Sequence, residues 1–188
     1  DNSLVELKEA ASDATTLEAC EVIGDKHWVI PVLRDVMGDG EATRRDSTDS
    51  YAWWQTHAPN YPLMVVAQGK DWNDFTATVD HFLLSGNFPA IEYVGVPRKL
   101  VEALGTRQMA LQYIDAVSPM TNVHLLGFSD DVCDDIICAN MSSVEGIDSA
   151  VPLRYSYSSG ANKLYTPSMD IPPRPADWFE KGTFTADD

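Results

Sequence analysis

Continuous apolar segments alternate with polar, helix-like segments along most of this chain. The apolar segments lie at residues 28–33, 63–67, 90–94 and 122–128, with a fifth contained in 144–151, and each ends in a polar or glycine-containing loop. Continuous apolar runs, as opposed to alternating ones, are typical of strands that are covered on both faces of a parallel sheet. The pattern therefore predicts repeated strand–helix units of the α/β class.

The segments between these runs have helical spacing. Trp72, Phe75, Val79 and Phe82 recur about one helical turn apart, and Asp71 stands where a side chain can cap the first turn. Further helices are predicted over residues 3–18, 41–57, 97–117 and 131–141, with Pro97 in a first turn and a break at Gly105. The chain from residue 156 onward is rich in Ser, Gly and Pro and is predicted to be irregular.

A parallel barrel brings the carboxyl ends of its strands to one rim, where such enzymes carry their chemistry. The residues that would meet there are Asp35, Gln68, Gly95, Ser129 and Asp148, and Asp1-Asn2-Ser3 would be a sixth strand end. Six ends are too few for eight strands, so the sheet is either open or the later part of a barrel. We predict a partial (β/α) barrel of TIM type over residues 1–155, with about five or six units, and an irregular tail over residues 156–188.

Composition narrows the class of protein. The chain has 188 residues, 44% of them hydrophobic, which suffices for one globular domain with a substantial core. No apolar stretch approaches the roughly 20 residues that cross a bilayer, so no membrane partner is expected. Cys20, Cys133 and Cys138 form neither a disulfide framework nor a zinc pattern, and the histidines are widely separated. We therefore predict no metal and no cofactor, and a reducing, cytoplasmic location.

The net charge of −16 argues against a nucleic-acid partner, because phosphate contacts need Lys and Arg. A local basic face can still attract phosphate groups despite the negative net charge, since salt screens charges beyond about 8–10 Å. The residues that could form such a face are Arg98, Lys99, Arg107, Arg154 and Lys163, although each of them is equally well a scattered solubilising charge.

The most distinctive motif is Gly146-Ile147-Asp148-Ser149-Ala150-Val151-Pro152-Leu153-Arg154, which follows His124-Leu125-Leu126-Gly127 and a short helix. In this order it resembles the queuine tRNA-guanine transglycosylase family, including its phage relatives that modify DNA. Val66-Ala67-Gln68-Gly69 resembles the family's strand that ends in a Gln-Gly pair, and Tyr93-Val94-Gly95-Val96 its glycine-containing loop. Val32-Leu33-Arg34-Asp35 and Asp1-Asn2-Ser3 are looser matches, and the resemblance covers roughly residues 1–155.

The resemblance implies base exchange at a nucleoside in DNA or tRNA. Asp148 would attack the anomeric carbon of the ribose and release guanine, and an incoming 7-deazaguanine would then displace the aspartate. Asp1 would transfer protons. Asp35 and Gln68 would bind the edge of the base, and Gly95 would let the backbone approach it closely. Arg154 would hold a phosphate or orient Asp148.

Each of these residues also has a purely structural interpretation. Asp148 and Asp1 are typical caps, Asp35 and Gly95 are typical turn residues, Gln68 can satisfy a strand end, and Arg154 can form an ion pair. The chain also lacks the family's zinc-binding cysteine cluster and its first strands, so a partner chain that completes the barrel is possible. The alternatives are a non-catalytic binding or assembly protein, and another α/β enzyme that uses Asp35 and Asp148 as an acid/base pair.

Overall fold

The computed structural model describes residues 11–23, 29–127, 137–141 and 143–147. The chain divides into two units, Asp1–Asp148 and Ser149–Asp188, and all the described residues belong to the first unit. In chain order its elements are α2 (Asp13–Ile23), α3 (Gly40–His57), β1 (Leu63–Val66), α4 (Trp72–Leu83), β2 (Ile91–Pro97), α5 (Leu100–Leu104), α6 (Arg107–Val117), β3 (Asn122–Leu126) and β4 (Val144–Ile147).

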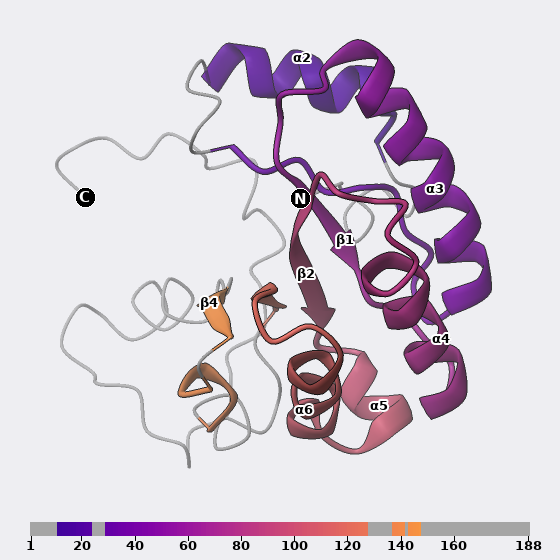
Figure 1. Cartoon of the computed structure of the whole chain (residues 1–188), viewed down its shortest axis with the longest axis vertical. Helices are drawn as coiled ribbons and strands as arrows, with labels where there is room; N and C mark the ends of the chain where they lie inside the picture. The colour runs from indigo at the N-terminus through magenta and orange to yellow at the C-terminus, as the bar shows by residue number, and fades with distance from the viewer. Residues whose placement is uncertain (1–10, 24–28, 128–136, 142, 148–188) are drawn as a thin grey trace, which may run out of the picture. The chain divides into compact units, whose positions relative to one another are not determined.

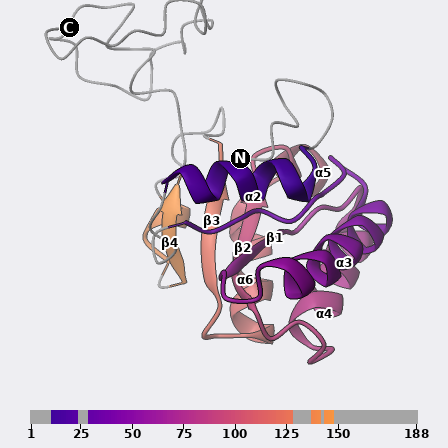
Figure 2. The same cartoon turned by 90° about the horizontal axis from the view of Figure 1, so that it is seen from above.

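The strands form one parallel sheet in the order β1-β2-β3-β4, as Figure 2 shows. Val32 adds a parallel bridge to Met64 on the far side of β1. Leu33 N donates to Met64 O at 2.8 Å and Met64 N donates to Pro31 O at 2.9 Å. Parallel neighbours in consecutive order, joined by right-handed crossovers, place their connecting helices on the same face of the sheet. The structure thus confirms the α/β class and the parallel sheet.

One face of the sheet packs against the helices. Figure 1 shows α3 and α4 together on one side of β1 and β2. The residues of this face are at most 2% exposed and share one hydrophobic core with Trp54, Phe75 and Ile114; they are Leu63, Val65, Val94, Val96, Val123 and Leu125. Because burying each such side chain contributes about 1.5–3 kcal/mol, this layer supplies much of the stability of the fold.

The opposite face of the sheet carries the alternate residues of the strands. At its centre Gly95 lies between the side chains of Met64 and Leu126. A Cβ atom added at Gly95 would lie 2.7 Å from Leu126 Cδ1 and 3.2 Å from Met64 Sδ. The absence of a side chain at Gly95 therefore allows its two neighbours to close over the middle strand.

The helices and strands occur largely where the pattern predicts them. Asp71 caps α4 by accepting a hydrogen bond from Asp74 N, and the chain breaks between α5 and α6 at Gly105, whose φ is +83°. The first described helix, α2, begins at Asp13, and residues 3–10 of the helix predicted over 3–18 lie outside the described residues. The same is true of residues 131–136 in the predicted helix over 131–141.

The end of β2 differs from the prediction. Gly95 and Pro97 were expected in a loop and in the first turn of a helix, and both expectations are wrong. Gly95 pairs with Val66 on one side and with His124 on the other, and Ala67 N donates to Gly95 O at 2.9 Å. Pairing of Gly95 on both sides, and of Pro97 with Leu126, keeps this segment extended despite two residues that usually weaken strands.

Candidate functional site

Asp35 and Gln68 meet at the carboxyl ends of two neighbouring chain segments. Asp35 follows the bridge at Val32, and Gln68 is the second residue after β1. Gln68 Nε2 donates to Asp35 Oδ2 at 2.6 Å, while Gly38 N donates to Gln68 Oε1 at 3.0 Å. The two side chains are only 6% and 4% exposed. The structure thus brings together the two residues that the family resemblance assigns to binding of the base.

This geometry fixes the orientation of the Gln68 amide. Its oxygen faces the N–H of Gly38 and its nitrogen faces a carboxylate, so the amide cannot flip without losing both hydrogen bonds. One N–H and one lone pair of the amide are not used by these two contacts. The pair can therefore present a donor and an acceptor to the polar edge of a heterocycle.

A cavity of about 380 Å³ opens beside the pair. It is lined by Met37, Gly38, Gln68, Gly69, Lys70, Lys99, Leu100 and Ala103. These residues come from three successive connections: the one after the bridge at Val32, the one after β1 and the one after β2. The volume is in the range of small-molecule sites, roughly 300–1,000 Å³. Gln68 belongs to both features and so joins the buried carboxylate to the cavity.

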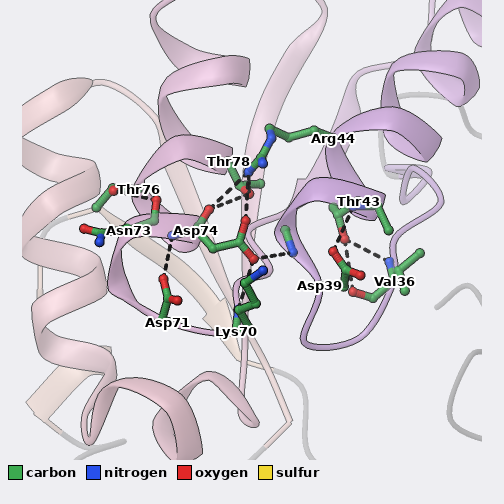
Figure 3. Close-up of polar contacts among 12 residues, drawn as sticks. Val36, Asp39, Thr43, Arg44, Lys70, Asp71, Asn73, Asp74, Thr76 and Thr78 are labelled. Carbon is green, nitrogen blue, oxygen red and sulfur yellow. Dashed lines mark hydrogen bonds and ion pairs between the residues drawn. The ribbon is translucent and has the colours of Figure 1, made fainter.

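Asp74 connects the start of α3 to the loop after β1, and Figure 3 shows it among Arg44, Thr78 and Lys70. From the first turn of α4 its carboxylate accepts hydrogen bonds from Gly40 N at 2.8 Å, from Lys70 N at 3.2 Å and from Arg44 Nη1 at 3.2 Å. Arg44 Nη1 also donates to Thr78 Oγ1 at 2.9 Å. We call Gly40, Arg44, Asp74 and Thr78, with the backbone N–H of Lys70, the Asp74 cluster. The cluster ties the start of α3 to the loop after β1.

The titration of Asp74 reflects this environment. Burial alone would raise the pKa of its carboxyl, but the hydrogen bonds from Gly40, Lys70 and Arg44, together with the charge of Arg44, lower the pKa below its ordinary value. Sequence reasoning missed this residue, because its partners in α3 lie 34 and 30 residues away in the chain. The available signal was the Asp71-x-x-Asp74 spacing, which indicates a helix start and nothing more.

Gly69 is required by packing. A Cβ atom at this position would lie 2.5 Å from Phe75 N and 2.6 Å from Phe75 Cα. These are backbone atoms of α4, which cannot move aside as a flexible side chain can. The Gln-Gly pair after β1 therefore has a physical basis: the glycine lets α4 approach the loop that carries Gln68 and Lys70.

His124 is a further residue that sequence reasoning did not assign to the site. It lies on β3 and pairs in register with Gly146 of β4. A Cβ atom at Gly146 would lie 2.6 Å from His124 Nδ1. Gly146 lies on β4, the strand that directly precedes Asp148 in the sequence. Because it has no side chain, it makes room for the imidazole of His124 on β3.

The basic residues of the predicted binding face divide into two groups. Arg107 is fully buried, and its Nη2 donates to Leu126 O at 3.0 Å and to Gly127 O at 2.6 Å. It therefore binds the carboxyl end of β3 and is not part of a surface face. Arg98 and Lys99 are exposed directly after β2. Arg154 and Lys163 lie outside the described residues.

Three of the remaining predicted site residues are not among those described. Asp1, Asp148 and Arg154 fall in this part of the chain, although Asp148 directly follows Ile147, the last residue of β4. Gly95 lies in β2 under Leu126 and Met64, so its predicted close approach to a base requires Leu126 to move.

Within the described ranges, no three His, Cys, Asp or Glu residues gather as a metal site would require. No helix there is long and apolar enough to cross a membrane.

The sequence matches no protein-family model, no curated protein and no solved structure.

Proposed function

We propose that this chain is a base-exchange transglycosylase that replaces guanine in DNA or tRNA with a 7-deazaguanine, on a partial (β/α) barrel. The observation that carries the proposal is the buried Asp35–Gln68 pair at the carboxyl ends of neighbouring segments of a parallel sheet. The consecutive strand order supports it, because strands of a barrel follow one another in this way. So does the position of Asp148 immediately after β4.

In this proposal, Asp148 is the nucleophile. A carboxylate oxygen forms a bond to C1′ of the ribose as the bond from C1′ to guanine N9 breaks, and guanine leaves with the electron pair and takes up a proton. The ring nitrogen of the incoming 7-deazaguanine then gives up its proton and attacks C1′, which releases the aspartate. Asp1 carries these protons, and a target base in a duplex is first flipped out of the stack.

The Asp35–Gln68 pair binds the base. A carboxylate accepts hydrogen bonds from the N–H groups of a purine, and the Gln68 amide supplies the complementary donor and acceptor. Because the pair is held by Gly38 N and is nearly excluded from solvent, these groups need little reorganisation when a base arrives.

The test is incorporation of labelled guanine into DNA or tRNA by the full chain. Asp148→Asn is expected to lower the rate by at least about a thousandfold, because the amide is a poor nucleophile. Asp35→Asn is expected to lower it about 10–100-fold, through loss of a charge-assisted hydrogen bond. Asp46→Asn, which alters an exposed pair with Arg45, is the matched control and should leave the rate unchanged. Exchange that persists in Asp148→Asn would refute the mechanism.

A non-catalytic binding or assembly protein is the second candidate. The observation that favours it is that Gln68 and Asp35 already satisfy each other in the buried site. In that case the wild-type chain shows no exchange but forms a stable complex with a partner chain that completes the barrel. For either function we propose a cytoplasmic location, which is consistent with Cys20 and Cys138 as buried free thiols.

A further inference from the structure

We propose that the cavity beside Gln68 binds a phosphate group through Lys70 and Lys99. Both lysines line it, and they are the two lysines of the described part of the chain. That this phosphate is the one next to the exchanged nucleoside rests on the proposed function. The existence of an anion site in this cavity does not depend on the proposed function.

The pairing of three of the five arginines in the described ranges supports the proposal. Arg34 pairs with Asp13 at 3.0 Å, Arg44 with Asp74 at 3.2 Å and Arg45 with Asp46 at 2.9 Å. Neither Lys70 nor Lys99 has a carboxylate within 4 Å in the described ranges, although the chain carries a net charge of −16. The acidic side chains of the described ranges that could neutralise the two lysines are thus not placed beside them.

The placement of the lysines also favours an anion. They come from different connections, Lys70 after β1 and Lys99 after β2, and line one cavity. Two positive charges that line the same cavity repel each other, and an anion between them removes that cost. The backbone N–H of Lys70 donates a hydrogen bond to the Asp74 carboxylate. This bond holds the main chain from which the Lys70 side chain extends.

The rest of the cavity suggests which anion. Met37, Leu100 and Ala103 provide apolar wall, and Gln68 provides a polar group that touches Asp35. A ligand with a flat heterocycle and an attached phosphate has both kinds of surface. The phosphate can belong to a polynucleotide or to a free mononucleotide, since the chemistry at the lysines is the same.

Binding of a fluorescent single-stranded oligonucleotide that contains guanine, followed by anisotropy over a salt series, tests the proposal. The full chain with Asp148→Asn is used, so that no turnover occurs. Adding Lys70→Gln and Lys99→Gln together is expected to weaken binding about tenfold at low salt and to reduce the slope of log K against log salt by about 0.7–1, the value for one lost phosphate contact.

Two further variants make the result specific. Arg45→Gln removes a charge that is 69% exposed, paired with Asp46 and outside the cavity, and should change binding less than about twofold. Lys70→Arg with Lys99→Arg keeps both charges and should restore binding to within about threefold. Equal affinity and equal salt slope in the double Gln variant and in Arg45→Gln would overturn the proposal.

Competition separates the two sources of phosphate. Displacement of the oligonucleotide by guanosine monophosphate, lost in the double Gln variant, supports the site with a mononucleotide as ligand. Lysine-dependent binding that guanosine monophosphate does not displace supports the site with a polynucleotide. If the wild-type chain exchanges guanine while the double Gln variant binds normally, the phosphate site is refuted and the proposed function stands. Lysine-dependent binding without any exchange supports the phosphate site and refutes the proposed function.

Discussion

The Asp74 cluster and the lysine-lined cavity are adjacent, yet they differ in how their charged groups are paired. In the cluster, Asp74 is 8% exposed and accepts hydrogen bonds from three parts of the chain. In the cavity, Lys70 and Lys99 are exposed and have no acidic partner within the described ranges. Lys70 belongs to both, through its backbone N–H in the first and its side chain in the second.

The difference separates charges that stabilise the fold from charges available to a ligand. A buried carboxylate surrounded by donors is costly to remove, because the donors are then left without a partner away from water. An exposed cation without a partner contributes little to folding and keeps its full charge for an incoming anion. Variants on the two sides should therefore affect different measurements.

Asp74→Ala is expected to have the largest effect on stability. It leaves Gly40 N and Lys70 N without their acceptor and removes the carboxylate that pairs with Arg44, and the free energy of unfolding should fall by about 3–5 kcal/mol. Chemical denaturation measures this loss. Asp46→Ala breaks an exposed pair and should cost less than about 1 kcal/mol. Equal losses of unfolding free energy in Asp74→Ala and Asp46→Ala would contradict the distinction between buried, hydrogen-bonded charges and exposed ones.

Gly69→Ala is expected to be next in size. Its Cβ would press on the backbone of Phe75, and the free energy of unfolding should fall by about 1–3 kcal/mol. Because Gly69 lies between Gln68 and Lys70, oligonucleotide binding should weaken as well. Loss of stability without any change in binding would show that the cavity does not depend on the approach of α4.

Gly95→Ala should have a smaller effect. The added Cβ meets the end of the Leu126 side chain and Met64 Sδ, both of which can give way, so a loss of about 1 kcal/mol is expected. In a chain that already carries Leu126→Ala, the Gly95→Ala substitution should lower the free energy of unfolding by less. A double-mutant cycle measured in urea detects this difference. An additive cycle would mean that Leu126 does not close over Gly95.

His81 should give the smallest effect, visible as a dependence on pH. Burial, with a smaller contribution from the charge of Arg44, lowers the pKa of its imidazole below the ordinary value of 6.5. The folded state therefore disfavours the protonated ring, so stability is fully present above pH 6.5 and is lost as the pH falls through the lowered pKa. His81→Gln should have a flatter stability profile below pH 6.5. Parallel profiles in denaturation series would contradict this assignment.

Sequence reasoning succeeded where the pattern is local or follows from strand order. The periodicity of Trp72, Phe75, Val79 and Phe82 predicts α4, and convergence of strand ends predicts that Asp35 and Gln68 lie together. It failed where pairing between distant segments decides the outcome. Gly95 is predicted in a loop and Pro97 in a helix, yet pairing of Gly95 with β1 and β3, and of Pro97 with β3, places both in a strand.

The charged residues show the same limit. Arg107 reads as a surface cation, but the carbonyls of Leu126 and Gly127 hold it in the interior. Asp74 reads as an ordinary helix-start residue, and its role depends on Gly40 and Arg44 in another helix. No local spacing encodes these partners, because they meet only when the sheet and its helices are assembled.

The most direct test of the proposed chemistry is a search for the covalent intermediate. The wild-type chain is incubated with guanine-containing DNA or tRNA in the absence of an incoming base, denatured, digested and analysed by mass spectrometry. We predict a nucleoside linked through C1′ to the peptide that contains Asp148, with equimolar release of guanine and no adduct in Asp148→Asn. An adduct on another residue, or release of guanine that continues in Asp148→Asn, would contradict it.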